Sequence, residues 1–123
     1  MSLTDLHVIL GRALRLFSLV VTLWSLILFV RRRDLEGNFW GTVVVGEALA
    51  LAQGALGLAR FLAGAAPARS VHFLYGVLGL LIWPAAFAFT RGRSGRREAL
   101  IWAATSLFLF TLTFRSETTA FPL

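Results

Sequence analysis

Four polar side chains stand out because they lie in otherwise apolar parts of the sequence: His7, Glu47, Gln53 and His72. An imidazole inside an apolar helix is a candidate axial ligand for haem iron, or the single ligand of a chlorophyll-type pigment. His72 is followed one helical turn later by Gly76, which leaves room for a flat macrocycle beside the helix backbone. His72 is therefore the first candidate for binding a cofactor.

His7 is the second candidate, because it begins a small and polar face of the first apolar segment. In an antiparallel four-helix arrangement the first and third helices run in the same direction, which puts His7 and His72 at the same end. A haem b held by His72, with or without His7, is one hypothesis. The structural alternative is that each imidazole only forms interfacial hydrogen bonds, and that His7 is solvated. Covalent haem of the c type is excluded, because the chain has no cysteine.

Glu47 is the residue whose placement costs the most free energy, since its carboxylate lies about 13 Å into the second apolar segment. A carboxylate at such a depth must be protonated, paired or in contact with water. One hypothesis is a proton or ion relay with Gln53 and a row of hydroxyls, as in a small transporter or channel component; the row is Ser18, Thr22 and Ser25. The alternative is a structural hydrogen bond to Thr105, to Ser106 or to a partner subunit.

The elements that must position these side chains are four long apolar segments. Of the 123 residues, 58% are hydrophobic and 15% charged, and the mean hydropathy is +0.78. A soluble domain carries about a quarter charged residues. The pattern predicts an all-α integral membrane protein, a single domain over 1–123, built as an antiparallel bundle of four transmembrane helices at about 8–30, 39–62, 71–90 and 98–115. Residues 116–123 are expected to form a short irregular end.

Small residues recur along one face of each predicted helix. Gly46, Ala50 and Gly54 form two overlapping small-xxx-small units, which let helix backbones approach closely. We expect these faces to pack against other helices. Lipid tails cannot form hydrogen bonds with hydroxyl groups, and another helix packs more closely on glycine than lipid does. Trp40 and Trp102 are expected to anchor the bundle at the membrane interface.

All twelve basic residues are arginine, and the net charge is +6. The connectors over 31–38 and 91–97 hold seven of them, which predicts by the positive-inside rule that both connectors are cytoplasmic and both termini outside, in a bacterial inner membrane. The remaining arginines are expected to form an outer rim that contacts anionic lipid or a partner; they are Arg12, Arg15, Arg60, Arg69 and Arg115. Nucleic acid is not an expected partner.

The sequence contains no hydrolase, nucleotide-binding or zinc-protease motif, and its supply of metal ligands is confined to two histidines, one methionine and a few carboxylates. No metal site is therefore expected beyond a haem iron. We expect no enzyme. The leading hypothesis is a non-catalytic accessory subunit of a bacterial membrane complex for respiratory or photosynthetic electron transfer, which binds lipid and other membrane subunits.

Part of the chain resembles a group of small membrane proteins. The stretches HFLYGVLGLL and AFTRGRSGRREALIWAATSLFLF, within residues 72–110, resemble those of uncharacterised small four-helix bacterial membrane proteins. The resemblance covers about a third of the chain and implies the four-helix fold without an assigned activity.

Overall fold

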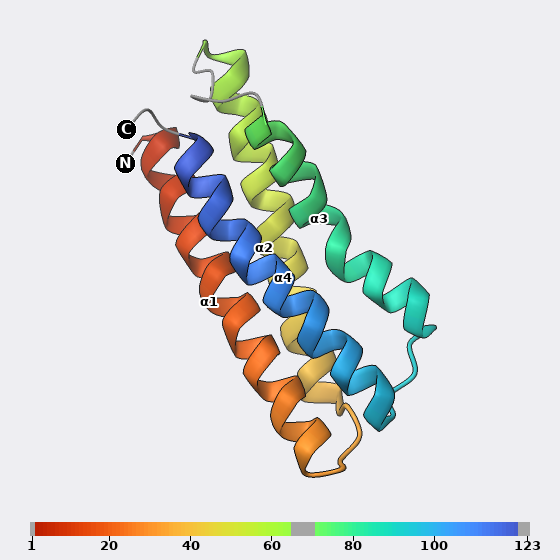
Figure 1. Cartoon of the computed structure of the whole chain (residues 1–123). Coiled ribbons are helices and arrows are strands. Elements are labelled where there is room, and N and C mark those ends of the chain that lie inside the picture. The colour runs from red at the N-terminus through yellow and green to blue at the C-terminus, as the bar shows by residue number, and fades with distance from the viewer. Residues whose placement is uncertain (1, 65–70, 121–123) are drawn as a thin grey trace.

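The computed structural model describes residues 2–64 and 71–120, and for 71 and 117–120 only the backbone. These residues form four helices, α1 (Leu3–Val30), α2 (Gly37–Leu62), α3 (Val71–Thr90) and α4 (Arg96–Ala120), as Figure 1 shows. Each helix is long and apolar enough to cross a membrane by length and composition. The prediction of an all-helical chain with four such segments is confirmed.

Two helix boundaries differ from the prediction. Helix α1 begins at Leu3, because Ser2 and Asp5 form a capping box: the Asp5 amide donates to Ser2 Oγ at 3.1 Å, and the Ser2 amide donates to Asp5 Oδ2 at 3.2 Å. The irregular end expected from residue 116 is wrong, because α4 continues to Ala120. Residues 96–121 include no glycine or proline, so this part of the sequence holds no residue that would stop the helix before Ala120.

The helices pack as a square in which neighbours along the chain are antiparallel. Helix α1 packs mainly against α4 and also against α2, while α3 packs against α4 and touches α2 least. Helices α1 and α3 therefore occupy opposite corners, as do α2 and α4. The start of α1 and the end of α4 lie at the same end of the bundle as the end of α2, and the two arginine-rich connectors lie at the other (Figure 1). We call these the terminal end and the arginine end.

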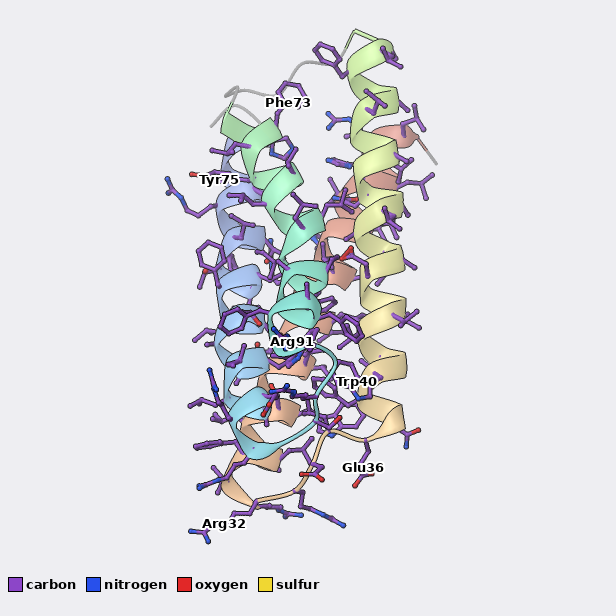
Figure 2. All side chains as sticks on the ribbon, turned by 90° about the vertical axis from the view of Figure 1, so that its right-hand side faces the viewer. Arg32, Glu36, Trp40, Phe73, Tyr75 and Arg91 are labelled. Carbon is purple, nitrogen blue, oxygen red and sulfur yellow. The ribbon has the colours of Figure 1, made fainter. Side chains whose placement is uncertain are left out.

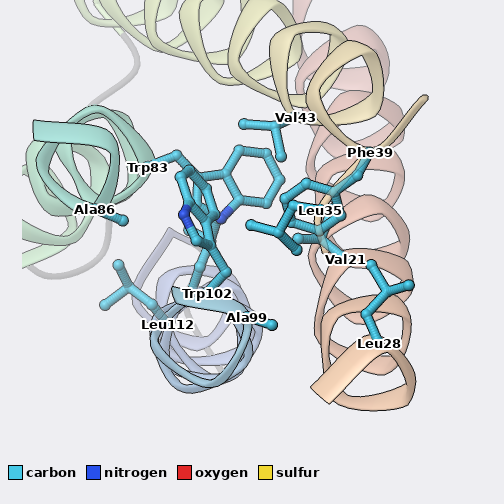
Figure 3. Packing of buried hydrophobic residues seen from close by; sticks show 11 residues of the cluster. Val21, Leu28, Leu35, Phe39, Val43, Trp83, Ala86, Ala99, Trp102 and Leu112 are labelled. Carbon is cyan, nitrogen blue, oxygen red and sulfur yellow. The ribbon is translucent and has the colours of Figure 1, made fainter. Parts of the chain in front are cut away.

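Large aromatic rings fill the bundle interior toward the arginine end (Figure 3). Phe39 and Trp102 are fully buried with ring centroids 5.8 Å apart, and Trp40 packs edge-on against Trp102 at 5.3 Å. The prediction that Trp102 anchors the bundle at the membrane interface is wrong. Its indole faces inward because the interior between the helices at this end needs a side chain of that volume. Trp40 is half-buried and packs against the same cluster.

One close approach joins α2 to α3 near the middle of the bundle. The Trp83 indole lies directly on Gly46, where an added Cβ would overlap Cζ3 of the ring and stand 2.8 Å from Cη2. The same indole donates from Nε1 to Ser106 Oγ of α4 at 3.0 Å. Glycine at position 46 therefore permits the contact that fixes three helices together, and α2 and α3 leave space between them beyond it.

The two arginine-rich connectors are tied to one another. The Leu35 amide donates to the Ser94 carbonyl at 2.9 Å. Arg96 Nε donates to the Phe29 carbonyl at 3.0 Å, and its guanidinium lies 4.4 Å from the Phe29 ring centroid. Arg32 and Arg91 have positive φ just after α1 and α3, where the chain leaves each helix. These contacts hold both connectors at one end of the bundle.

Candidate functional site

A cavity of about 440 Å³ lies among the helices toward the terminal end. This volume is within the usual range for small-molecule sites, about 300–1,000 Å³. Figure 2 looks toward α2 and α3 and labels Phe73 and Tyr75, two of the residues that line it. Its walls are mostly aliphatic side chains and glycines, and its polar side chains are His7, Arg12, Arg15, Gln53, Arg60, His72, Tyr75, Thr113 and Ser116.

The two histidines meet in this cavity from opposite corners of the bundle. Their ring centroids are 6.2 Å apart, and the ring planes are inclined by 74°. Helices α1 and α3 make no close backbone contact, so the imidazoles face each other across the bundle interior. His7 is only 6% exposed, and the expectation that it is solvated ahead of the apolar segment is wrong. Its burial follows from α1 beginning at Leu3, a full turn before the ring.

The imidazole of His72 is oriented by α4. Its Nδ1 donates a hydrogen bond to the Ser116 carbonyl at 2.9 Å, and the Ser116 hydroxyl lies 3.3 Å from the same nitrogen. A carbonyl oxygen can only accept, so Nδ1 carries a proton, and in the neutral imidazole the lone pair is then on Nε2. A histidine whose Nδ1–H is held by a backbone carbonyl is the usual arrangement of a metal-ligating imidazole.

The imidazole of His7 rests on α2. A Cβ added at Gly57 would lie 3.3 Å from His7 Cε1, so the glycine allows the ring to lie against the helix backbone. The His7 side chain is 6% exposed. Its Nδ1 is buried and has no hydrogen-bond partner among the residues that the structure describes. An unsatisfied buried nitrogen costs about 1–3 kcal/mol, so this atom is a candidate contact for a bound group.

Glycines keep the space around the imidazoles open. A Cβ built on Gly54 or Gly76 would meet nothing within 4 Å, whereas at Gly11 it would stand 3.0 Å from Nε2 of Gln53. The Gln53 side chain thus covers Gly11, and its buried Oε1 lacks a hydrogen-bond partner in the described part of the chain. Gly76 lies where the sequence predicts it, one turn below His72 and beside open space.

The same spacing occurs in both halves of the chain, as His-x-x-x-Gly at 7–11 and at 72–76. Because α1 and α3 are parallel diagonal helices, this repeat is the sequence signal that pairs the two residues. Two other parts of the site carry no such signal. Ser116 acts through its backbone carbonyl, and Gly57 through the absence of a side chain.

Three of the five outer arginines gather at the cavity: Arg12, Arg15 and Arg60 line it. The Arg15 guanidinium lies 4.0 Å from the centroid of the Phe114 ring. Arg115 is exposed on α4 and does not line the cavity, and Arg69 lies outside the described residues.

Glu47 does not line this cavity, although Gln53 does. Its Oε1 is buried without a hydrogen-bond partner within residues 2–64 and 71–120. The hydroxyls expected to extend a relay donate instead to carbonyls of their own helix, Ser18 to Arg15 at 2.8 Å, Thr22 to Ser18 at 2.7 Å and Ser25 to Val21 at 2.6 Å. Thr105 likewise donates to the Ile101 carbonyl, and Ser106 accepts from Trp83.

Within the described part of the chain, no three His, Cys, Asp or Glu side chains gather closely enough to hold a metal ion. Comparison with protein-family models, with curated proteins and with solved structures finds no match to this chain. The choice of a ligand therefore depends on the chemistry of the cavity residues themselves.

Proposed function

We propose that this chain is an integral membrane protein that binds haem b between His7 and His72. The observation that carries the proposal is the pair of imidazoles that face each other across the bundle interior, both of them lining the cavity. Two imidazoles that ligate one metal ion from opposite sides, through bonds of about 2 Å, have centroids roughly 6 Å apart. The separation of the two centroids in the structure is 6.2 Å.

The residues around the rings fit this role. The Ser116 carbonyl holds His72 in the tautomer whose Nε2 can donate electrons to iron. Gly54 and Gly76 leave space for the faces and edges of a macrocycle, and the aliphatic walls suit its apolar ring. Bound between two imidazoles, haem supplies reversible one-electron transfer at its iron. The chain's own part is to ligate, to orient both rings and to exclude water.

A chlorophyll-type pigment is a weaker fit than haem. Such a pigment takes a single axial ligand, so it would use His72 and leave the buried Nδ1 of His7 unsatisfied. Haem uses both imidazoles, which is why we favour it.

The membrane placement is part of the proposal. The apolar surface of the helices supports a bilayer setting, since large aliphatic and aromatic side chains are exposed along all of them. The seven arginines of the two joined connectors favour a cytoplasmic position for the arginine end. Both termini and the cavity then lie toward the outer face of a bacterial inner membrane.

The test is the visible absorption spectrum of the protein purified in detergent with haem supplied during expression. We expect a Soret band and the sharp reduced bands of a six-coordinate haem. His72→Ala should abolish them, and His7→Ala should convert the spectrum to a five-coordinate form. Thr111→Ala, at an exposed position of α4, is the matched control. A colourless protein that gains no Soret band on haem addition would refute the proposal.

A second candidate is assembly with other membrane subunits as a non-catalytic accessory subunit. It is favoured by an exposed stripe of small residues on α2, formed by Gly41, Ala48 and Ala52. Small outward-facing residues in a bilayer allow another helix to approach closely. Ala48→Leu should weaken co-purification of a partner without changing the haem spectrum. A solubilised protein that is monomeric and carries no partner from its native membrane would count against this role.

A further inference from the structure

We infer that the cavity binds its macrocycle as an anion, with the carboxylates held by Arg12, Arg15 and Arg60. This inference rests on the proposed haem site and adds the chemical form of the ligand. It follows from the charges around the cavity and does not depend on the ligation geometry.

The cavity lining is strongly asymmetric in charge. Three guanidinium groups line it, and no aspartate or glutamate is among the described residues that do so. Holding cations beside an apolar cavity costs desolvation free energy, which an anionic ligand offsets. A guanidinium has five N–H donors and binds carboxylates through two of them at once. The inference therefore does not require any of these arginines to lack another contact.

The three arginines line the cavity from two helices, Arg12 and Arg15 from α1 and Arg60 from α2. Arg60 lies one turn from Gly57, toward the terminal end, and lines the same cavity as both imidazoles. Arg12 follows Gly11 directly and is exposed, which places it at the boundary between the cavity and the surroundings. Arg15 is partly buried and held against the Phe114 ring. The apolar ring would thus lie between the helices and its acidic groups beside these cations.

This arrangement distinguishes among ligands of similar shape. Haem b has two propionates that guanidinium groups can bind, whereas an esterified pigment or a quinone presents no carboxylate to them. The cavity should therefore prefer a free-acid macrocycle to the same macrocycle with its acids esterified.

The experiment titrates the detergent-solubilised protein, freed of cofactor, with haem b and with its dimethyl ester, and follows the Soret band. We expect the free acid to bind more tightly by about tenfold or more, as one charge-assisted pair of roughly 1.4 kcal/mol would give. The Arg12→Gln, Arg60→Gln double variant should bind both forms equally, and Arg60→Lys should retain part of the preference. Arg115→Gln, outside the cavity lining, is the matched control.

The outcomes separate the two levels of the proposal. Equal affinity of the wild-type protein for acid and ester would overturn this inference and leave the haem site standing. Absence of a Soret shift with either form would remove the haem site itself. Equal affinities together with phosphatidylglycerol that is retained by the wild type and lost in the double variant would assign the arginines to a lipid phosphate, which also overturns the inference. An unchanged far-ultraviolet circular dichroism spectrum shows that the variants have folded.

Discussion

Gly46→Ala tests the contact that closes the bundle beneath the cavity. The new methyl would overlap the Trp83 ring, which is 1% exposed and therefore has no open space to move into. Forcing a methyl into a packed core costs about 1–3 kcal/mol. Moving the indole also breaks its hydrogen bond to Ser106, at about 1 kcal/mol. The better helix propensity of alanine returns about 0.5–1 kcal/mol, so we expect a net loss of about 2 kcal/mol.

Gly41→Ala is the control in the same helix, because a Cβ there meets nothing within 4 Å and only the propensity gain applies. The assay is unfolding by sodium dodecyl sulfate in mixed micelles, followed by tryptophan fluorescence. We expect Gly41→Ala to be as stable as the wild type or slightly more stable, and Gly46→Ala to unfold at lower detergent fraction. Equal stability of the two variants would refute the close packing of α2 on α3 at this point.

Three further predictions concern the cavity, the buried carboxylate and the orientation. Gly76→Leu should fold normally, since its Cβ meets open space, but should lose most of its haem absorbance because the side chain fills the cavity. Glu47→Gln should raise stability by about 1 kcal/mol, with an unchanged spectrum, because it replaces a carboxylate whose buried Oε1 has no hydrogen-bond partner in the described part of the chain with a neutral amide. A loss of proton flux in proteoliposomes would instead support a transport role. The chain has no cysteine, so Arg93→Cys and Ala63→Cys can report topology through impermeant thiol reagents in whole cells. We expect only the cysteine at position 63 to react, and labelling at position 93 would contradict the orientation.

The sequence was sufficient for the elements and for the meeting of the two histidines. Hydrophobic runs of this length predict helices well, and an antiparallel bundle puts the starts of α1 and α3 at one end. The partner of His72 could not be predicted, because Ser116 contributes a backbone carbonyl from 44 residues away. Every residue has a backbone carbonyl, so the residue type at position 116 does not identify it as the acceptor.

The wrong predictions concern side chains that can form their hydrogen bonds or packing contacts in more than one way. A serine or threonine in an apolar helix can bond across to a neighbour or back to its own carbonyls. Ser18, Thr22 and Ser25 do the latter. A tryptophan near a helix end can face lipid or the interior, and only the space between helices decides. That space is a tertiary property, which is why Trp102 was misplaced.

The most direct test of the two-histidine site is the electron paramagnetic resonance spectrum of the ferric, haem-loaded protein. The inclination of 74° between the imidazole planes predicts a low-spin signal of the highly anisotropic kind that near-perpendicular axial imidazoles produce. His7→Ala should convert it to a high-spin signal. A high-spin signal in the wild type, or a low-spin signal that persists in His7→Ala, would contradict ligation by both histidines.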